Sequence, residues 1–146
     1  MDTTVFKGFD IRGDAAAGLT TATAWDIGKA LADWLPTSGS VAIACGLDGS
    51  KLLTDALIEG LRLQGRDVVH IGTCGKIALT EAIIHEGHSG GVLINHDTLS
   101  QEETIELYRD AGKLIDRETG LAEIQVLVES GNFVPAAIKG DYTAIA

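Results

Sequence analysis

The residues best suited to chemistry lie in a short polar segment that follows an apolar run. Residues 92–94 read Val-Leu-Ile, and the polar segment Asn95-His96-Asp97-Thr98 comes directly after them. An imidazole beside a carboxylate can move protons, activate a nucleophile or hold a divalent cation. The segment is therefore either a reactive site or what remains of one.

Two other loops carry polar side chains that could join this segment. They are residues 46–50, which read GLDGS, and residues 72–76, which read GTCGK. Each loop follows a predicted parallel strand, and parallel sheets bind ligands where such strands end. The three loops together supply these candidate groups: Asp48, Ser50, Thr73, Cys74, Lys76, His96, Asp97 and Ser100.

Two kinds of chemistry stay open at this edge of the sheet. Cys74 beside His96 would be a thiolate–imidazolium pair, if the fold brought the two side chains together. His96 and Asp97, joined by Asp48, could ligate a divalent metal, although neighbours on one strand point to opposite faces. The same residue types also fill ordinary loops, and we expect no native metal site.

The elements that must position these loops follow from hydrophobic periodicity. Residues 20–35 form one predicted helix, a second begins after Ser50, and residues 77–86 form a third. Strands that are covered on both faces are typically short continuous apolar runs. Three such runs follow the three predicted helices in turn, at residues 41–45, 67–72 and 90–95. This order predicts a parallel sheet with right-handed crossovers.

Residues 103–115 have a different pattern. Ile105 and Leu107 alternate with Glu106 and Tyr108, and this period of two predicts an edge strand. Too few residues precede it for a helical crossover, so it should run antiparallel to its neighbour.

A last helix is predicted over residues 121–130. The predicted fold class is therefore α/β. It is a three-layer α/β/α arrangement with a four-stranded mixed sheet, three parallel strands plus one antiparallel edge strand, in a single domain over residues 1–146.

Composition excludes several classes of function. The chain has 146 residues, 45% of them apolar, and a formal net charge of −10, which opposes binding to a phosphate backbone. No apolar run approaches the ~20 residues of a membrane helix, and no signal peptide is visible. We expect a cytoplasmic protein with no nucleic-acid partner, no membrane association and free, partly buried thiols at Cys45 and Cys74.

Five segments resemble one known family when they are taken in order. They are VFKGFDIRG (5–13), ALIEGLRLQGRDVVHIG (56–72), GGVLI (90–94), IELYRDAGKLI (105–115) and GLAEIQVLVESGNF (120–133). Together they resemble the N-terminal domain, domain I, of the α-D-phosphohexomutases, the phosphoglucomutase/phosphomannomutase family. The likeness covers nearly the whole chain, and FDIRG is its most specific piece.

The resemblance implies a particular chemistry in the full-length enzymes. Their four domains move a phosphoryl group between the 1- and 6-oxygens of a sugar through a phosphoserine. That serine lies in a Thr-Ala-Ser-His-Asn-Pro loop after the third strand, and a magnesium ion is held largely by aspartates of the second domain.

The sequence departs from the family pattern at the residues that handle charge. Asp97 stands at the nucleophile position, and no proline follows it. Leu47 and Ser50 replace both arginines of the usual Gly-Arg-Asp-Gly-Arg loop, and CGKIAL, which contains Lys76, replaces a proline-containing helix start. Arg12 is the one basic residue that the resemblance carries over. The remaining ligand-binding candidates are Asp48, Ser50, Lys76, His96 and Asp97.

Two hypotheses follow from these departures. The first is a non-catalytic, stand-alone homologue of domain I that binds a sugar-phosphate-like ligand, a protein partner or a second copy of itself. A homodimer would form through the face left vacant by the missing second domain. The second is a phosphotransfer enzyme of carbohydrate metabolism that works in trans or uses Asp97 in place of the serine. We expect a cofactor, Mg²⁺, only in the second case.

Overall fold

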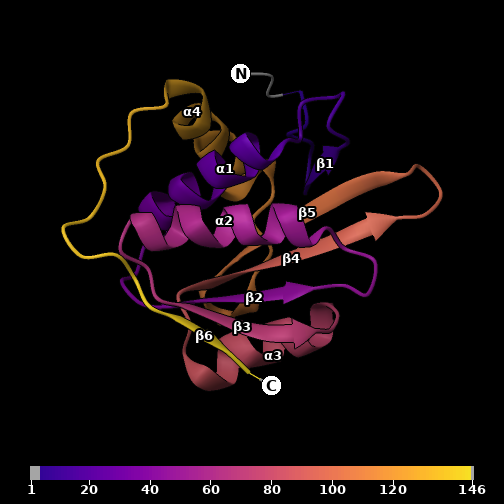
Figure 1. Cartoon of the computed structure of the whole chain (residues 1–146). Helices are drawn as coiled ribbons and strands as arrows, with labels where there is room; N and C mark the ends of the chain where they lie inside the picture. The colour runs from indigo at the N-terminus through magenta and orange to yellow at the C-terminus, as the bar shows by residue number, and fades with distance from the viewer. Residues whose placement is uncertain (1–3, 146) are drawn as a thin grey trace.

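A six-stranded sheet forms the centre of the molecule in the computed structural model, which describes residues 4–145 (Figure 1). The strands lie in the order β1-β5-β4-β2-β3-β6. Their bounds are β1 Ile11–Gly13, β2 Val41–Cys45, β3 Val68–Thr73, β4 Gly90–Asp97, β5 Glu102–Arg109 and β6 Tyr142–Ala144. Antiparallel pairing joins β5 to β1 and β4, and the other neighbours pair in parallel, so β5 alone runs against the rest.

Helices cover both faces of this sheet, as the three-layer prediction requires. The helices α1 (Thr21–Trp34), α2 (Lys51–Leu63) and α4 (Ala122–Ser130) lie on one face, and α3 (Lys76–Glu86) lies on the other. None of the helices within residues 4–145 combines the length and apolar character needed to cross a bilayer.

Helix ends follow the predicted caps. The Thr20 hydroxyl accepts a hydrogen bond from the Thr23 N–H at 3.2 Å, and the Ser50 hydroxyl accepts one from Leu53 at the same distance. Each bond satisfies a donor that the helix itself leaves open. Gly87 ends α3 in the left-handed conformation, with φ of 71°.

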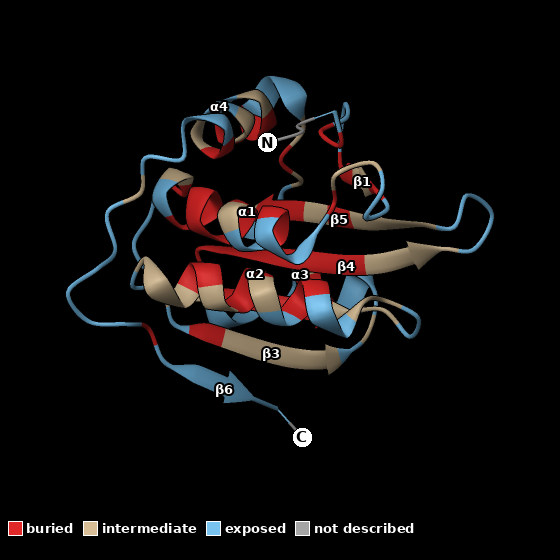
Figure 2. Ribbon diagram, turned by 45° about the horizontal axis from the view of Figure 1, so that its top comes forward, coloured by how far each residue is buried: buried red, intermediate tan, exposed pale blue. Residues whose placement is uncertain are grey.

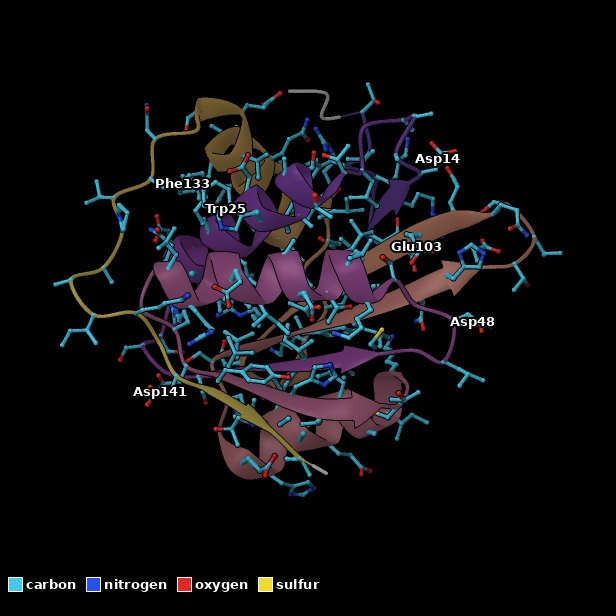
Figure 3. The ribbon with its side chains drawn as sticks, in the orientation of Figure 1. Asp14, Trp25, Asp48, Glu103, Phe133 and Asp141 are labelled. Carbon is cyan, nitrogen blue, oxygen red and sulfur yellow. The ribbon has the colours of Figure 1, made fainter. Side chains whose placement is uncertain are left out.

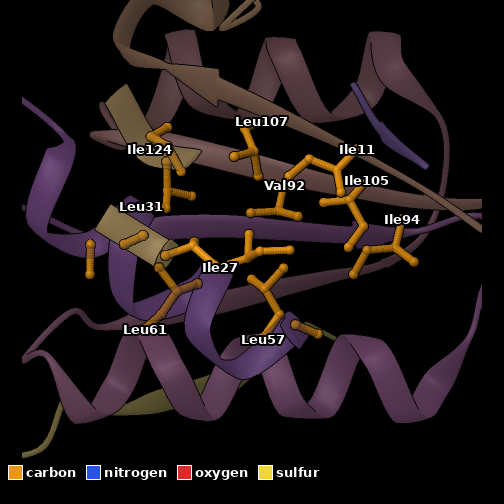
Figure 4. Close-up of a cluster of buried hydrophobic side chains, with 14 of the residues drawn as sticks. Ile11, Ile27, Leu31, Leu57, Leu61, Val92, Ile94, Ile105, Leu107 and Ile124 are labelled. Carbon is orange, nitrogen blue, oxygen red and sulfur yellow. The ribbon is translucent and has the colours of Figure 1, made fainter. Parts of the chain in front are cut away.

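The core is divided by the sheet into two unequal parts. The larger cluster, shown in Figure 4, packs α1, α2 and α4 against the sheet through side chains such as Ile27, Leu57 and Ile124. The smaller cluster lies under α3 and contains Leu79 and Leu93. Figure 2 shows that β4, at the centre of the sheet, is largely buried, whereas β6 is exposed along its length.

The predicted sheet of four strands is wrong in number. β1 and β6 have three residues each, which is too short for a periodic pattern to be visible in the sequence. β1 pairs with the outer side of β5, so β5 is not an edge strand. Tyr108, which alternates with Ile105 and Leu107 and so lies on the other face of the sheet, is fully buried because α3 covers that face.

Two glycines let α1 and α2 cross at close range. A Cβ at Gly28 would clash with the Leu57 carbonyl oxygen, and a Cβ at Gly60 would clash with the Trp25 carbonyl oxygen. The two helices therefore meet backbone to backbone.

Replacing Gly60 with Ala should lower the free energy of unfolding. Alanine gains up to ~1 kcal/mol in helix propensity, but overpacking a tight interior contact costs ~1–3 kcal/mol, and here the obstacle is backbone that cannot rotate away. Urea unfolding monitored by circular dichroism measures the difference. Gly8→Ala is the control, because nothing lies within 4 Å of its Cβ position. Equal stability of the two variants would contradict the close crossing.

Candidate functional site

The predicted polar segment lies at the corner of a β-hairpin formed by β4 and β5. Asp97 pairs with Glu102 and His96 pairs with Glu103, so residues 98–101 form the connecting turn. The Gln101 N–H donates to the Asp97 carbonyl oxygen at 2.8 Å and closes the turn. The segment is thus part of a tight hairpin and not an open loop.

His96 and Asp97 point to opposite faces of the sheet. Successive side chains of a strand alternate, and each of the two takes partners from a different layer. His96 shares the face of α2 with Ile94, and Asp97 shares the face of α3 with Leu93. The adjacent pair therefore does not act on one ligand.

On the α2 face, a carboxylate joins the hairpin to the start of α2. Glu103 accepts a hydrogen bond from the Ser50 N–H at 2.7 Å through one oxygen, and its other oxygen pairs with Nδ1 of His96. Figure 3 shows Glu103 between the hairpin and α2, with Asp48 on the adjacent loop. Ser50, His96 and Asp48 are thus brought to one place, with Glu103 at its centre.

The electrostatics of His96 follow from this contact. The hydrogen bond to Glu103 is the main cause that raises the pKa of His96 above its ordinary value, and the charge of Asp48 adds a smaller effect in the same direction. A raised pKa means that the folded state favours the imidazolium. The contact therefore stabilises the fold below the unfolded pKa and loses that contribution as pH rises through the folded value.

On the α3 face, Asp97 is held by backbone and by one arginine. Its Oδ1 accepts hydrogen bonds from the N–H groups of Leu99 at 3.0 Å and Ser100 at 3.4 Å. Its Oδ2 lies 3.4 Å from Nη1 of Arg12, which also pairs with Asp10 at 3.0 Å. The two backbone bonds are the largest causes that lower the pKa of Asp97, with Arg12 adding less.

The remaining candidates are separate from these two groups. Cys74 packs against the small cluster under α3, with its Sγ 3.9 Å from the Gly72 carbonyl oxygen, and burial raises the pKa of its thiol. The structure therefore does not bring Cys74 and His96 together as a thiolate–imidazolium pair. Lys76 begins α3, where its charge acts on the half-buried Glu106.

A metal site is not formed by the candidate carboxylates and histidines. Among residues 4–145, no three His, Cys, Asp or Glu side chains gather to hold an ion. His96 and Asp97 face apart, and the carboxylate oxygens of Asp97 are already engaged by Leu99, Ser100 and Arg12. The described residues thus form no magnesium site of their own, and the resemblance places the family's magnesium largely on a second domain, so we derive no step through the ion.

Sequence reasoning missed the acidic partners of this region. Glu103 and Glu102 lie on β5, and Asp10 precedes β1. The antiparallel pairing of β5 with β4 was expected, but its register was not, because register depends on the length of the turn. The signal that could have identified Glu103 is its spacing of two from Ile105, which places both on the α2 face.

Comparisons with known proteins agree with the geometry of the fold. The chain matches the family model described as phosphoglucomutase/phosphomannomutase, alpha/beta/alpha domain I, over residues 3–134. It is 33% identical over 147 residues to a phosphomannomutase of Salmonella typhimurium, covering 98% of this chain and 32% of that protein. It is 34% identical over 134 residues to a phosphomannomutase of Klebsiella pneumoniae, covering 90% of this chain and 85% of that one.

A solved structure shows the same fold. The phosphoglucomutase/phosphomannomutase family protein from Burkholderia thailandensis matches with a TM-score of 0.83 and 22% identity, covering 99% of this chain and 33% of that one. The chain thus spans about a third of the length of the Salmonella and Burkholderia proteins, and most of the length of the Klebsiella protein.

The contact between His96 and Glu103 can be tested by titration. The pKa of His96, measured by NMR from the imidazole resonances, should lie above its ordinary value of 6.5. Glu103→Gln should lower the pKa of His96, because the substitution removes the negative charge that favours the imidazolium. If His96 titrates at the same pH in both proteins, the contact does not exist in solution.

Proposed function

Because this chain belongs to the phosphoglucomutase/phosphomannomutase family and matches its domain I, we propose that it is a non-catalytic homologue of that domain, which acts by binding. The observation that carries the proposal is the state of the Asp97 carboxylate. That side chain stands where the family resemblance puts the phosphoserine, and it is tied into its own hairpin turn.

A carboxylate in this position supplies charge but not the family's transfer chemistry. Phosphoryl transfer depends on a positioned nucleophile and on cations that neutralise the transferring group. Oδ1 of Asp97 accepts two backbone hydrogen bonds, and Oδ2 faces Arg12. The lowered pKa keeps the carboxylate ionised, so it can stand in for part of a phosphoserine's negative charge.

The start of α2 supports the same proposal. A helix N-terminus attracts anions through its free N–H groups, and a phosphate-binding loop would add arginines there. In this chain the loop carries Leu47 and Ser50, and the Glu103 carboxylate already accepts the hydrogen bond from the Ser50 N–H. A substrate phosphate would meet a carboxylate where the resemblance implies arginine.

Binding to a partner is favoured by apolar side chains at the same edge of the sheet. Leu47 is 87% exposed and Leu99 is 96% exposed, and each is the outermost apolar residue of its loop. Ile77, at the start of α3, is 75% exposed. The three residues follow the carboxyl ends of β2, β4 and β3, and exposed apolar side chains on neighbouring loops can form a protein contact surface. We propose a second copy of this chain as the partner.

One observation supports the second candidate function, that of a phosphotransfer enzyme. The Klebsiella relative, of which this chain covers 85%, carries the name phosphomannomutase. A phosphotransfer enzyme that works in trans, or that uses Asp97 as a carboxylate nucleophile, would fit that name.

A turnover assay separates the two candidates. The protein is incubated with glucose 1-phosphate or mannose 1-phosphate, Mg²⁺ and a trace of the hexose 1,6-bisphosphate, and formation of the 6-phosphate is followed by a coupled assay. We expect no turnover above that of Asp97→Ala, because Asp97 stands in place of the phosphoserine and Leu47 and Ser50 stand in place of the two loop arginines. Turnover that disappears in Asp97→Ala would establish the enzyme instead.

Light scattering after size exclusion tests the dimer. We expect a concentration-dependent dimer that strengthens at higher salt, because two chains of charge −10 repel each other and salt screens the repulsion. Leu99→Glu together with Leu47→Glu should yield monomer. Val126→Glu, at an exposed position on α4, is the control and should remain dimeric. A monomer at all concentrations of the unaltered chain would exclude self-association.

A further inference from the structure

A cleft of about 420 Å³ opens on the α2 face of the sheet, away from the Asp97 corner. Its floor is the end of β3, with His70, Gly72 and Thr73, and one wall is the first turns of α2, with Lys51 and Asp55. The loop after β2 and the exposed strand β6 complete it. Small-molecule sites are ordinarily clefts of roughly 300–1,000 Å³, so this one is large enough.

The cleft lies where the chain's connections diverge. From β2 the chain turns to α2 on one face of the sheet, and from the neighbouring β3 it turns to α3 on the other face. Open α/β sheets bind ligands at such a point, outside the carboxyl ends of two adjacent strands whose connections go to opposite faces. Residues 45–49 and 70–73 are these two strand ends.

A backbone irregularity orients the histidine in the floor. The register between β2 and β3 shifts after Ile43, so that Ala44 pairs with Gly72 and one residue of β3 is extra. Gly72 has a φ of 97°, and its N–H donates to Nδ1 of His70 at 3.0 Å. Bulges of this kind are common beside binding sites, where they re-aim a side chain. The bond makes Nδ1 an acceptor, so the neutral ring carries its proton on Nε2.

The groups around His70 are balanced in charge. Lys51 and Asp55 form an ion pair at 2.8 Å on the wall of the cleft, and burial lowers the pKa of His70, which keeps the ring neutral at pH 7. The ion pair leaves this wall with no net charge, so a charged ligand gains little from it. Hydroxyl groups fit it well, because each can accept from Nε2–H or from Lys51 and donate to Asp55.

The opposite wall offers an aromatic surface. Tyr142 of β6 is 45% exposed and lines the cleft, and it lies on the same face as His70 because Val68 pairs with Tyr142 and His70 with Ala144. The flat face of an aromatic ring suits the C–H groups of a saturated ring, and the phenol hydroxyl can bond to its hydroxyl groups.

We propose that this cleft binds an uncharged, polyhydroxylated ring compound of monosaccharide size, held by His70, the Lys51–Asp55 pair and Tyr142. The site is separate from the Asp97 corner, and it does not depend on whether the chain is catalytic. The ligand is small, so binding should be weak, with a dissociation constant of roughly millimolar order.

NMR chemical-shift mapping with D-glucose and myo-inositol tests the proposal. Each compound should shift amide resonances of residues 45–49, 70–73 and 142–145 in a saturable way, and inorganic phosphate at the same concentration should not. His70→Ala should weaken binding by about three- to tenfold, the usual effect of one lost hydrogen bond. Tyr142→Ala, at an exposed position that leaves the core intact, should weaken it as well.

His85→Ala is the control, because His85 is exposed on α3, outside the cleft. It should leave the dissociation constant unchanged, and the amide spectrum of each variant reports whether it is folded. Three outcomes would overturn the proposal. The first is that neither ring compound causes saturable shifts. The second is that the shifts map to residues outside the cleft, or remain in both cleft variants. The third is that phosphate binds the cleft as strongly as the ring compounds do.

Discussion

The turn between β4 and β5 depends on the hydrogen bonds that the Asp97 carboxylate accepts from the backbone of Leu99 and Ser100. They close the corner of the hairpin, and the fixed corner sets the register that opposes His96 to Glu103 and Asp97 to Glu102. The ion pair with Arg12 is the weaker support, since both side chains are about a third exposed and water screens such pairs. A residue that holds its own turn in this way is poorly placed to act as a nucleophile.

The register has consequences on both faces of the sheet. Towards α2 it brings Glu103 against the Ser50 N–H, so a side chain of this chain occupies the helix terminus that would otherwise attract an anion. On the α3 face it places Asp10, Arg12 and Asp97 in one network, in which the positive charge of Arg12 is already paired with two carboxylates. Both of the places where the family likeness suggests phosphate handling are thus filled from within. The neutral cleft beside His70 lies outside this arrangement and remains open.

Much of the fold could be predicted because it depends on local signals. Thr20 and Ser50 cap helices through hydroxyls whose role is set within three residues, and Gly87 ends a helix because it tolerates a positive φ. The parallel strands were visible as apolar runs. β1 and β6 were not, because three residues carry no period and their positions depend on partners about 90 and 70 residues away, as Ile11–Ile105 and Val68–Tyr142 show. The prediction of the candidate site was incomplete for the same reason. Asp97 and His96 could be identified by residue type, but their contacts with Arg12 and Glu103 depend on the register of the strands.

The central claim is that Asp97 holds the hairpin and carries no phosphoryl group. Intact-protein mass spectrometry after incubation with glucose 1,6-bisphosphate and Mg²⁺ tests it most directly, since it detects a covalent phosphoryl group without requiring turnover. The account predicts an unchanged mass for the protein and for Asp97→Ala alike. A phosphorylated species that is absent from Asp97→Ala, and that hydroxylamine cleaves as it cleaves an acyl phosphate, would contradict it.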